Sequence, residues 1–396
     1  MRKMKTLALI LAALMIAASL CACSVTNPNY TVLEVGDMDI GVNAYYNYYK
    51  YYAQMWSMYG YDVTTTTSQK NLQEQVFSAL INNALPVVVA KQNGITLTEE
   101  EEAEVQAEYQ EEVDSLLSQY ASSVDSSITD EDAIRAEEEK LCKAELKKSG
   151  WSYTKYLKVL EEDIRNTAIG QKYLETLYAD VNITEEDAKE YYDSQIEVKR
   201  AEYAEDPAQF FTDYSSAISN GDMSTILVVP EGYHCYKHIL VKKAETEDEA
   251  EVSNINQKLE EIKAKIKDGV DFDELIEEYG EDTGMESEPY KSEGYIVSED
   301  VIDQYYEGFA EAALALENIG DVTEEPVETE IGYHFIKYVG DKEAGDVPFD
   351  DVKEGIIEQL TEDEKTTIYQ TNLTKWKEEI KITKHYDLVS SITYSN

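Results

Sequence analysis

The sequence predicts an α+β protein in which a small α/β module is inserted into a large helical domain. Two observations predict this class. Apolar residues recur at spacings of three and four along most of the chain, as on one face of a helix, whereas residues 230–343 follow the order strand, helix, strand. A further helical pattern lies within residues 344–396, so helical segments flank the module on both sides. With 396 residues, the chain is long enough for more than one hydrophobic core.

The beginning of the chain has the pattern of an export signal. Arg2, Lys3 and Lys5 precede an unbroken apolar run over residues 7–18. This run is too short to span a bilayer, which needs about 20 apolar residues, and it fits the hydrophobic region of a signal peptide. We therefore expect residues 1–22 to be a signal peptide.

The end of this signal resembles a bacterial lipobox. In Leu20-Cys21-Ala22-Cys23, a small residue precedes the second cysteine. The resemblance implies that Cys23 is acylated and anchors the chain in a lipid bilayer, with residues 23–30 as a tether. The alternative is an ordinary secretory signal that happens to contain cysteines.

The composition is strongly acidic and argues against two classes of partner. The chain has 81 Asp and Glu against 34 Lys and Arg, which gives a formal charge of −47. Nucleic acid is not expected as a partner, because phosphate binding requires clustered Lys and Arg. An electrostatic attachment to anionic lipid is disfavoured for the same reason. The apolar fraction of 43 % excludes wholesale disorder.

Residues 31–229 are expected to form the helical domain. It starts with a short strand and turn over residues 31–38. A tyrosine-rich helix over residues 44–61 follows, and then a helix over residues 71–92 that Pro86 is expected to kink or to bound.

Two later helices have well-marked starts. Thr98 and Thr184 are each followed by acidic residues in the capping-box pattern, which suits the positive end of the helix dipole. A further helix is expected over residues 156–177, and loops are expected over residues 122–132 and 212–221.

The tyrosine-rich helix permits two interpretations. Its aromatic residues and Met55 recur on one face between Tyr45 and Tyr59. Such a stripe is more often helix core than binding surface. Its density exceeds what one buried stripe needs, so the surplus rings could also face a groove that holds unfolded chains.

The module and the last helix follow. Strands are expected over residues 234–241 and 331–339, with a helix over residues 247–267 between them. A long helix is expected to start after Pro348, to reach about Ile380 and to pack on the helical domain.

Two of the four histidines occupy matching places in the two strands. His238 lies in Tyr-Lys-His-Ile-Leu-Val, and His334 lies in Gly-Tyr-His-Phe-Ile-Lys. Between them are Asp-Phe-Asp-Glu-Leu at 271–275, Tyr-Gly-Glu-Asp at 279–282 and Phe-Ala-Glu-Ala-Ala at 309–313. These motifs, in this order, resemble the parvulin family of peptidyl-prolyl cis-trans isomerases.

The resemblance implies roles for five residues. His238 and His334 are expected to form a hydrogen-bonded pair beneath the substrate amide, and Asp282 stands where relatives carry Cys or Asp. Phe309 matches the aromatic floor of the proline pocket, and Tyr305 falls where many relatives have methionine. The predicted catalytic set is therefore the two histidines with Asp282, and the predicted substrate-binding set is the two aromatic residues.

This chemistry requires no cofactor and no metal, because no bond to carbon is broken. The barrier of about 20 kcal/mol arises from amide resonance. A site lowers it by favouring the twisted amide, through oriented polar groups and an apolar seat for the proline ring.

The chain also departs from the family pattern. The glycine-rich segment of relatives is replaced by Tyr-Lys-Ser-Glu-Gly-Tyr-Ile at 290–296, which keeps only Gly294, and Ile331 stands where some members have a polar residue. Two functions therefore stay open: an active isomerase, or a lipoprotein chaperone without turnover whose histidines only hold strand ends together. A solute-binding lipoprotein lacks support, because only one small α/β module is visible.

The surroundings of the module resemble extracytoplasmic foldases of the PrsA and SurA type. The resemblance implies unfolded or partly folded exported polypeptides as partners, and the outer face of a bacterial cell membrane as the location. A homodimer stays open, as does a pairing of Cys142 with Cys235.

Overall fold

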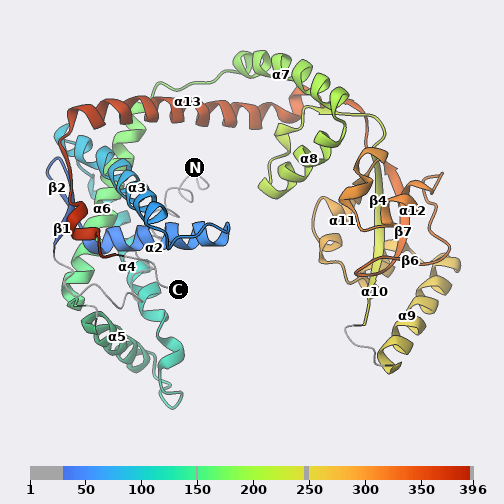
Figure 1. The fold of residues 1–396 in the computed structure, drawn as a ribbon, viewed down its shortest axis with the longest axis horizontal. Coiled ribbons are helices and arrows are strands. Elements are labelled where there is room, and N and C mark those ends of the chain that lie inside the picture. Colours follow the sequence, from blue (N-terminus) through green and yellow to red (C-terminus); the bar gives the residue numbers. More distant parts are fainter. Residues whose placement is uncertain (1–29, 149, 245–248, 393–396) are drawn as a thin grey trace. The chain divides into compact units, whose positions relative to one another are not determined.

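The computed structural model describes residues 30–148, 150–244 and 249–392 (Figure 1). The chain divides into two compact units. Unit 1 comprises Met1–Val181 with Glu364–Asn396, and unit 2 comprises Asn182–Asp363. The predicted α+β class is confirmed, because long helices dominate the chain and a four-stranded sheet lies in unit 2.

A three-stranded antiparallel sheet joins the two sequence segments of unit 1. β1 (Thr31–Val35) and β2 (Met38–Gly41) form the hairpin that the sequence predicts. β9 (Ile382–Lys384) pairs with the other edge of β1. Periodicity could not predict β9, because it is only three residues long and its partner lies near the other end of the chain.

Two hydrophobic clusters hold unit 1 together. One joins β1, α2 and α3 with the end of the last long helix, α13 (Phe349–Glu379), and the other joins α4, α5 and α6 around the buried Cys142. A short α14 follows β9. The helices of unit 1 are α2 (Val42–Met58), α3 (Thr66–Gln92), α4 (Glu99–Ser118), α5 (Glu131–Lys148), α6 (Tyr153–Leu177) and α14 (Tyr386–Val389), with a 3-10 turn at η2 (Ala121–Ser123).

The tyrosine-rich helix α2 is buried in its first half and exposed at its end. Tyr45 and Tyr49 are at most 1 % exposed, which confirms a core role for these two residues. Met58, Tyr59 and Tyr61 are 77 %, 71 % and 65 % exposed. The end of α2 and the turn after it therefore present aromatic and apolar side chains to solvent.

Both predicted capping boxes are present. The Thr98 hydroxyl accepts from the Glu101 amide, and the Glu101 carboxylate accepts from the Thr98 amide. Thr184 and Asp187 repeat this arrangement at the start of α7 (Glu185–Glu205). Pro86 lies within α3, which continues to Gln92.

The predicted loop over residues 212–221 is wrong. Helix α8 (Ala208–Asn220) occupies it and ends at Gly221, whose φ of +68° is the left-handed conformation common after a helix. Phe210, Tyr214 and Ala217 form its buried stripe. The Ser- and Asn-rich exposed face of this helix hides that short stripe in the sequence.

The module in unit 2 is a four-stranded antiparallel sheet in the order β5-β4-β7-β6. The two predicted strands are its long central pair, and Leu240 faces His334 across them. A separate two-stranded ladder joins β3 to β8. The strands of unit 2 are β3 (Val228–Val229), β4 (His234–Lys242), β5 (Tyr295–Val297), β6 (Val327–Glu328), β7 (Gly332–Asp341) and β8 (Gly345–Asp346).

The two faces of the sheet have different neighbours. Successive side chains of a strand point to opposite faces. Ile239 and Phe335 pack against α9 and α10 in one cluster, whereas Tyr236 and Ile336 pack against α12 in another. The remaining helices of unit 2 are α9 (Glu249–Lys267), α10 (Phe272–Tyr279), α11 (Tyr290–Glu293) and α12 (Phe309–Leu314), with 3-10 turns η3 (Met223–Thr225), η4 (Thr283–Glu286) and η5 (Glu299–Gln304).

The last long helix, α13 (Phe349–Glu379), contributes to both units. Val352 and Ile356 are buried in a cluster of unit 2, and Leu373 and Trp376 are buried in a cluster of unit 1. Within the described ranges, no helix is both long and apolar enough to cross a membrane.

Candidate functional site

The two histidines meet on one face of the module. His238 on β4 and His334 on β7 are 5 % and 2 % exposed. Their Nδ1 atoms lie 3.0 Å apart, and their rings stack with centroids 5.1 Å apart. The register explains this contact, because Leu240 faces His334 and His238 is two residues before Leu240 on the same face.

Asp282 lies at the other end of the His238 ring. Its Oδ2 is 2.7 Å from His238 Nε2 and accepts a 3.0 Å hydrogen bond from the Tyr295 hydroxyl. Its Oδ1 accepts from the Gly284 amide at 2.9 Å, because Asp282 caps the short turn η4. Three donors therefore hold this carboxylate in one orientation.

Thr329 completes the chain of hydrogen bonds at the other histidine. This residue is 4 % exposed, and its Oγ1 lies 2.9 Å from His334 Nε2. Its amide donates to the Gly332 carbonyl at 2.8 Å, in the turn that leads into β7. The polar neighbour that the sequence lacks at Ile331 is thus supplied two residues earlier. Sequence reasoning missed Thr329, and its place five residues before His334 was the available signal.

The Asp282 carboxylate fixes the direction of the first hydrogen bond in the chain. A carboxylate only accepts, so His238 donates through Nε2 to Asp282. The Nδ1 atoms of His238 and His334 form the next hydrogen bond, and which of them donates depends on which ring carries the proton. Thr329 Oγ1 forms a hydrogen bond with His334 Nε2 at 2.9 Å and also lies 3.3 Å from the Gly332 carbonyl oxygen. Every ring nitrogen of the two histidines therefore has a hydrogen-bond partner.

The charges of the chain follow from its surroundings. Burial alone would raise the pKa of Asp282, but hydrogen bonds from His238, Gly284 and Tyr295 outweigh it and lower this pKa to about 2. Burial and the neighbouring His238 lower the pKa of His334 to about 3. Near pH 7, Asp282 is therefore an ionised carboxylate and His334 is a neutral imidazole.

Aromatic rings cover the histidine pair. Phe309 at the start of α12 meets both histidine rings edge-on, with centroid distances of 5.3 Å and 5.2 Å. Tyr305 stacks on Phe309 at 5.6 Å with an interplanar angle of 18°. Tyr295 contacts His238 at 5.5 Å, and Tyr290 stacks on Tyr295 at 4.4 Å. All five predicted site residues thus lie together, joined by Tyr295 and Tyr290, which sequence reasoning did not assign to the site.

The changed glycine-rich segment has a definite structure. Residues 290–293 form the turn α11, and Gly294 follows with a φ of +86°. A Cβ on Gly294 would lie 2.6 Å from the carbonyl oxygen of Tyr236. The retained glycine is therefore required where this segment approaches β4.

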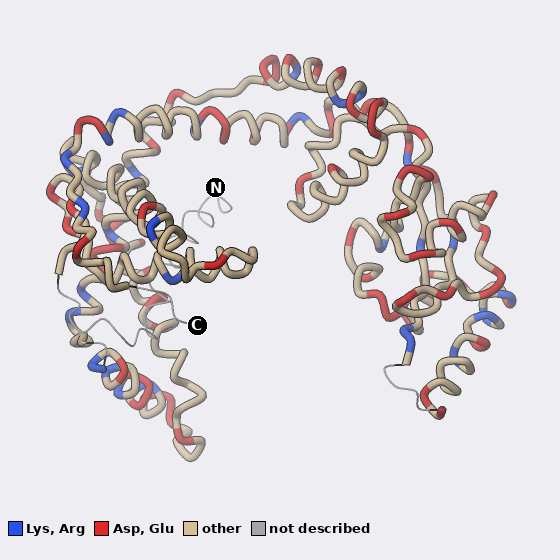
Figure 2. Tube along the Cα trace, in the orientation of Figure 1, with Lys and Arg blue, Asp and Glu red and all other residues tan. Residues whose placement is uncertain are grey.

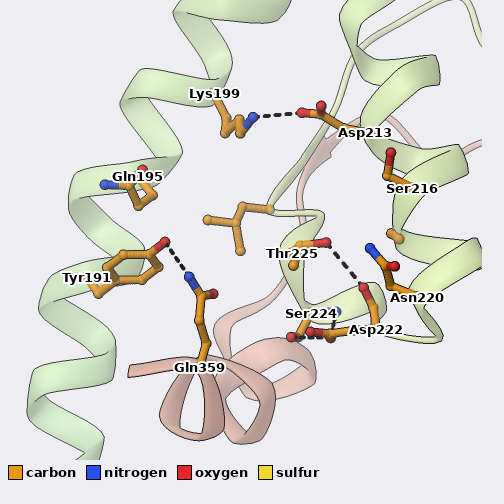
Figure 3. Close-up of a pocket in the computed structure, with 12 residues that line it drawn as sticks. Tyr191, Gln195, Lys199, Asp213, Ser216, Asn220, Asp222, Ser224, Thr225 and Gln359 are labelled. Carbon is orange, nitrogen blue, oxygen red and sulfur yellow. Dashed lines mark hydrogen bonds and ion pairs between the residues drawn. The ribbon is translucent and has the colours of Figure 1, made fainter. Parts of the chain in front are cut away.

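Unit 2 contains a pocket that lies away from the histidines. A polar pocket of about 360 Å³ lies between α7, α8 and α13, and none of the five predicted site residues lines it (Figure 3). Lys199 is paired there with Asp213, and the Gln359 amide donates to the Tyr191 hydroxyl (Figure 3).

The cysteines and candidate metal ligands of the chain can also be located in the structure. Cys142 and Cys235 are buried and free, so they do not pair. In the described part of the chain, no group of three or more His, Cys, Asp or Glu side chains is placed to hold a metal ion. The predicted lipidation residue, Cys23, lies outside the described residues.

Comparison with known proteins agrees with the motifs. Residues 238–340 match a family model described as the PPIC-type PPIASE (rotamase) domain. The chain is 26 % identical to the foldase protein PrsA of Clostridium acetobutylicum over 316 residues, which cover 80 % of this chain and 74 % of that protein. It is 27 % identical to the foldase protein PrsA of Clostridium botulinum strain Langeland over 260 residues, which cover 65 % of this chain and 62 % of that protein. A shorter match joins it to the foldase protein PrsA 3 of Bacillus anthracis, with 34 % identity over 143 residues, 36 % of this chain and 42 % of that protein.

Solved structures give matches of the same kind. The crystal structure of PrsA from Bacillus subtilis aligns with 18 % identity and a TM-score of 0.23, over 89 % of this chain and 93 % of that chain. A SurA-like chaperone structure from Campylobacter jejuni aligns with 12 % identity and a TM-score of 0.30, over 90 % of this chain and 99 % of that chain. The resemblance to parvulin-type domains and to PrsA foldases is confirmed by the sequence matches.

Proposed function

We propose that this protein is a membrane-anchored extracytoplasmic foldase, which binds unfolded exported polypeptides and catalyses cis-trans isomerisation of X-Pro bonds. One observation carries the catalytic part: the buried His238–His334 pair lies beneath aromatic rings and is joined to an ionised Asp282. The match of residues 238–340 to the PPIC-type domain supports the same reaction.

The site acts on an amide without exchanging atoms with it. Rotation about the C–N bond of a planar amide is slow because resonance gives that bond partial double-bond character. The same resonance form places negative charge on the carbonyl oxygen. The fixed negative charge of Asp282 disfavours that form when the carbonyl lies beside it, so the twisted amide is stabilised relative to the planar one. His238, His334 and Thr329 keep this charge oriented, and Phe309 seats the proline ring.

The net charge of the module limits the kinds of peptide that it is expected to bind. Residues 230–343 contain 32 Asp and Glu and 10 Lys, with no Arg, and acidic positions outnumber basic ones along unit 2 (Figure 2). Anionic side chains are recognised by Arg clusters, which the module lacks. We therefore expect peptides with neutral or basic residues before proline to be bound better than acidic or phosphorylated ones.

The polypeptide-binding part of the proposal is assigned to the helical segments. Residues 31–229 and 344–396 form the proposed chaperone domain around the module, residues 230–343, and Cys23 with residues 23–30 anchors it to the membrane after removal of residues 1–22. Exposed side chains at the end of α2, namely Met58, Tyr59 and Tyr61, support this assignment. Tyrosine supplies contact area at low entropy cost.

The catalytic proposal is tested with a protease-coupled prolyl peptide assay on residues 24–396. The expected result is a rate above background that disappears in His238→Ala. His385→Ala is the matched control, because this histidine lies outside the site beside Glu34 and its loss should leave the rate unchanged. A wild-type rate equal to background would overturn the isomerase.

A chaperone without turnover is the second candidate, and the replaced glycine-rich segment favours it. Its test is suppression of aggregation of an unfolded client by the same chain. The variant Met58→Ser/Tyr59→Ser/Tyr61→Ser is expected to lose protection, whereas Ile319→Ser, at a side chain that is 63 % exposed in unit 2, retains it. Protection by a chain that shows no prolyl rate would support this second candidate, and equal protection by both variants would contradict the assigned surface.

A further inference from the structure

Tyr305, which is predicted to bind substrate together with Phe309, also holds the Phe309 ring in place. It follows the turn η5 and is half-buried, and its ring stacks on Phe309 with centroids 5.6 Å apart. Phe309 in turn meets the rings of His238 and His334. The position of the Tyr305 ring therefore sets the position of the ring that seats proline.

The hydroxyl of Tyr305 supports a different part of the same site. It donates to the carbonyl oxygen of Ile296 on β5. The preceding residue on β5, Tyr295, donates through its own hydroxyl to Asp282. One side chain thus holds both the aromatic floor and the strand that carries a donor to the carboxylate.

Tyr305 is in turn held by a residue from outside the module. Phe211 on α8 meets the Tyr305 ring edge-on, with centroids 5.8 Å apart and an interplanar angle of 65°. The segment that matches the PPIC-type domain starts at residue 238, so α8 is not part of that domain. The helical part of unit 2 therefore contributes a contact to Tyr305, a predicted substrate-binding residue.

Helix α8 is itself anchored to the sheet. Phe210 is fully buried and packs on Tyr233 at 4.7 Å, and the Tyr233 hydroxyl donates to the Pro207 carbonyl at 2.8 Å. Near the middle of the helix, the Tyr214 hydroxyl accepts at 2.9 Å from Lys342, which directly follows β7. These contacts fix where Phe211 stands relative to the strands.

The other face of α8 has a separate environment. Asp213, Ser216 and Asn220 line the polar pocket between α7, α8 and α13 (Figure 3). Because a helix turns 100° per residue, these positions lie opposite Phe211. Helix α8 therefore has that pocket on one face and Phe211, with its contact to Tyr305, on the opposite face.

We infer that Phe211 is a positioning residue of the isomerase site and that α8 belongs to the catalytic unit. This inference rests on the proposed function, because it assigns a part to the same reaction. Phe211 acts through Tyr305, which holds the Phe309 ring and β5. A module cut from the chain before residue 238 lacks this support.

The test compares Phe211→Ala with wild type on residues 24–396, with kcat and KM measured separately. Phe309 contacts the proline ring in the ground state and in the transition state, so the loss is expected in KM with little change in kcat. Loss of one aromatic pair predicts a rise in KM between about twofold and tenfold. Phe211→Tyr keeps the ring and is expected to restore the wild-type KM.

The matched control is Ile218→Ala on the same helix, which packs in the same cluster as Phe211. If Phe211 only stabilises the fold, both alanine variants lower Tm and neither changes KM, and the inference fails. In a Tyr305→Ala background, Phe211→Ala is expected to have no further effect on KM, and an additive effect would also overturn it. A wild-type chain without any prolyl rate contradicts the proposed function instead, so the two failures are distinguishable.

Discussion

The core of unit 1 and the site of unit 2 use the same side chain in different ways. In α2, Tyr45 and Tyr49 stack at 6.2 Å and are fully buried, and among the described residues their hydroxyls have no hydrogen-bond partner. At the site, Tyr295 donates to Asp282 and Tyr305 donates to Ile296. Burial raises the pKa of all four hydroxyls, so all four stay protonated at neutral pH.

This difference separates packing from positioning. A buried polar group without a partner costs about 1–3 kcal/mol, so the two hydroxyls in α2 weaken the core that their rings fill. The two hydroxyls at the site each satisfy a buried acceptor and hold it in place. Tyrosine is thus a bulky ring in one region and a donor in the other.

The largest expected effect comes from Asp282→Asn at the site of unit 2, because this substitution removes the fixed negative charge but keeps a hydrogen-bond acceptor. We expect kcat to fall by about 100-fold, because loss of one oriented electrostatic group typically has an effect of that size. Asp268→Asn, at an exposed position, is the control and should leave kcat unchanged. A variant that keeps wild-type kcat would show that the charge plays no part in the reaction.

Acidification is expected to destabilise the site of unit 2 more than the core of unit 1. The folded state lowers the pKa of His334 from 6.5 to about 3, so the unfolded chain binds the proton more tightly, and stability is lost as pH falls below 6.5. The lowered pKa of Asp282 acts in the same direction between 3.8 and about 2. Together these shifts predict a loss on the order of 3 kcal/mol for unit 2 between pH 6.5 and pH 4, almost all of it from His334.

Two readouts separate the units, because all three tryptophans, Trp56, Trp151 and Trp376, lie in unit 1 and their fluorescence reports on that unit. We expect hydrogen exchange to accelerate in the module on acidification while tryptophan emission stays constant. His334→Gln should remove most of the acid sensitivity. Equal acid loss in both units would contradict the assignment to the site.

Removal of single hydroxyls gives a finer contrast at the site. Tyr295→Phe removes the donor to the ionised Asp282, and hydrogen bonds to charged groups contribute about 1.5–3 kcal/mol. We expect a lower free energy of unfolding and a few-fold lower kcat. Urea unfolding and the peptide assay on the same preparation test both effects, and an unchanged kcat would limit Tyr295 to a structural role.

The same substitution in α2 should have the smallest effect and the opposite sign. Tyr49→Phe removes a buried hydroxyl that has no hydrogen-bond partner in the described chain, so stability is expected to stay constant or to rise by up to about 1 kcal/mol. Urea unfolding monitored by tryptophan emission measures it. Destabilisation comparable to that of Tyr295→Phe would remove the contrast between the two regions.

Features that depend on neighbouring residues could be predicted from the sequence. Thr98 and Thr184 mark their helix starts through residues three positions away, and the α13 pattern ends within a residue of the expected position. The histidine pair was predictable because the motifs around His238 and His334 resemble known strand ends. Each of these signals is local or carried by a familiar motif.

Features that depend on distant contacts could not be predicted. The partner of β1 comes from residues 382–384, and no short window of sequence contains both. Tyr295 joins the site only because β5 pairs with β4 in one register, and Phe211 reaches Tyr305 only because α8 is a helix. Strand register and helix packing decide these contacts, and they are properties of the folded chain.

The pairing of β1 with β9 also affects the order in which the two units can fold. A polypeptide is synthesised from its N-terminus, so residues 31–35 exist long before residues 382–384 are made. Unit 2 is one continuous segment and has all its residues before unit 1 does. The unit with the histidine pair can therefore fold first, whereas β1 in unit 1 can pair with β9 only after residues 382–384 are made, a long-range closure that slows folding.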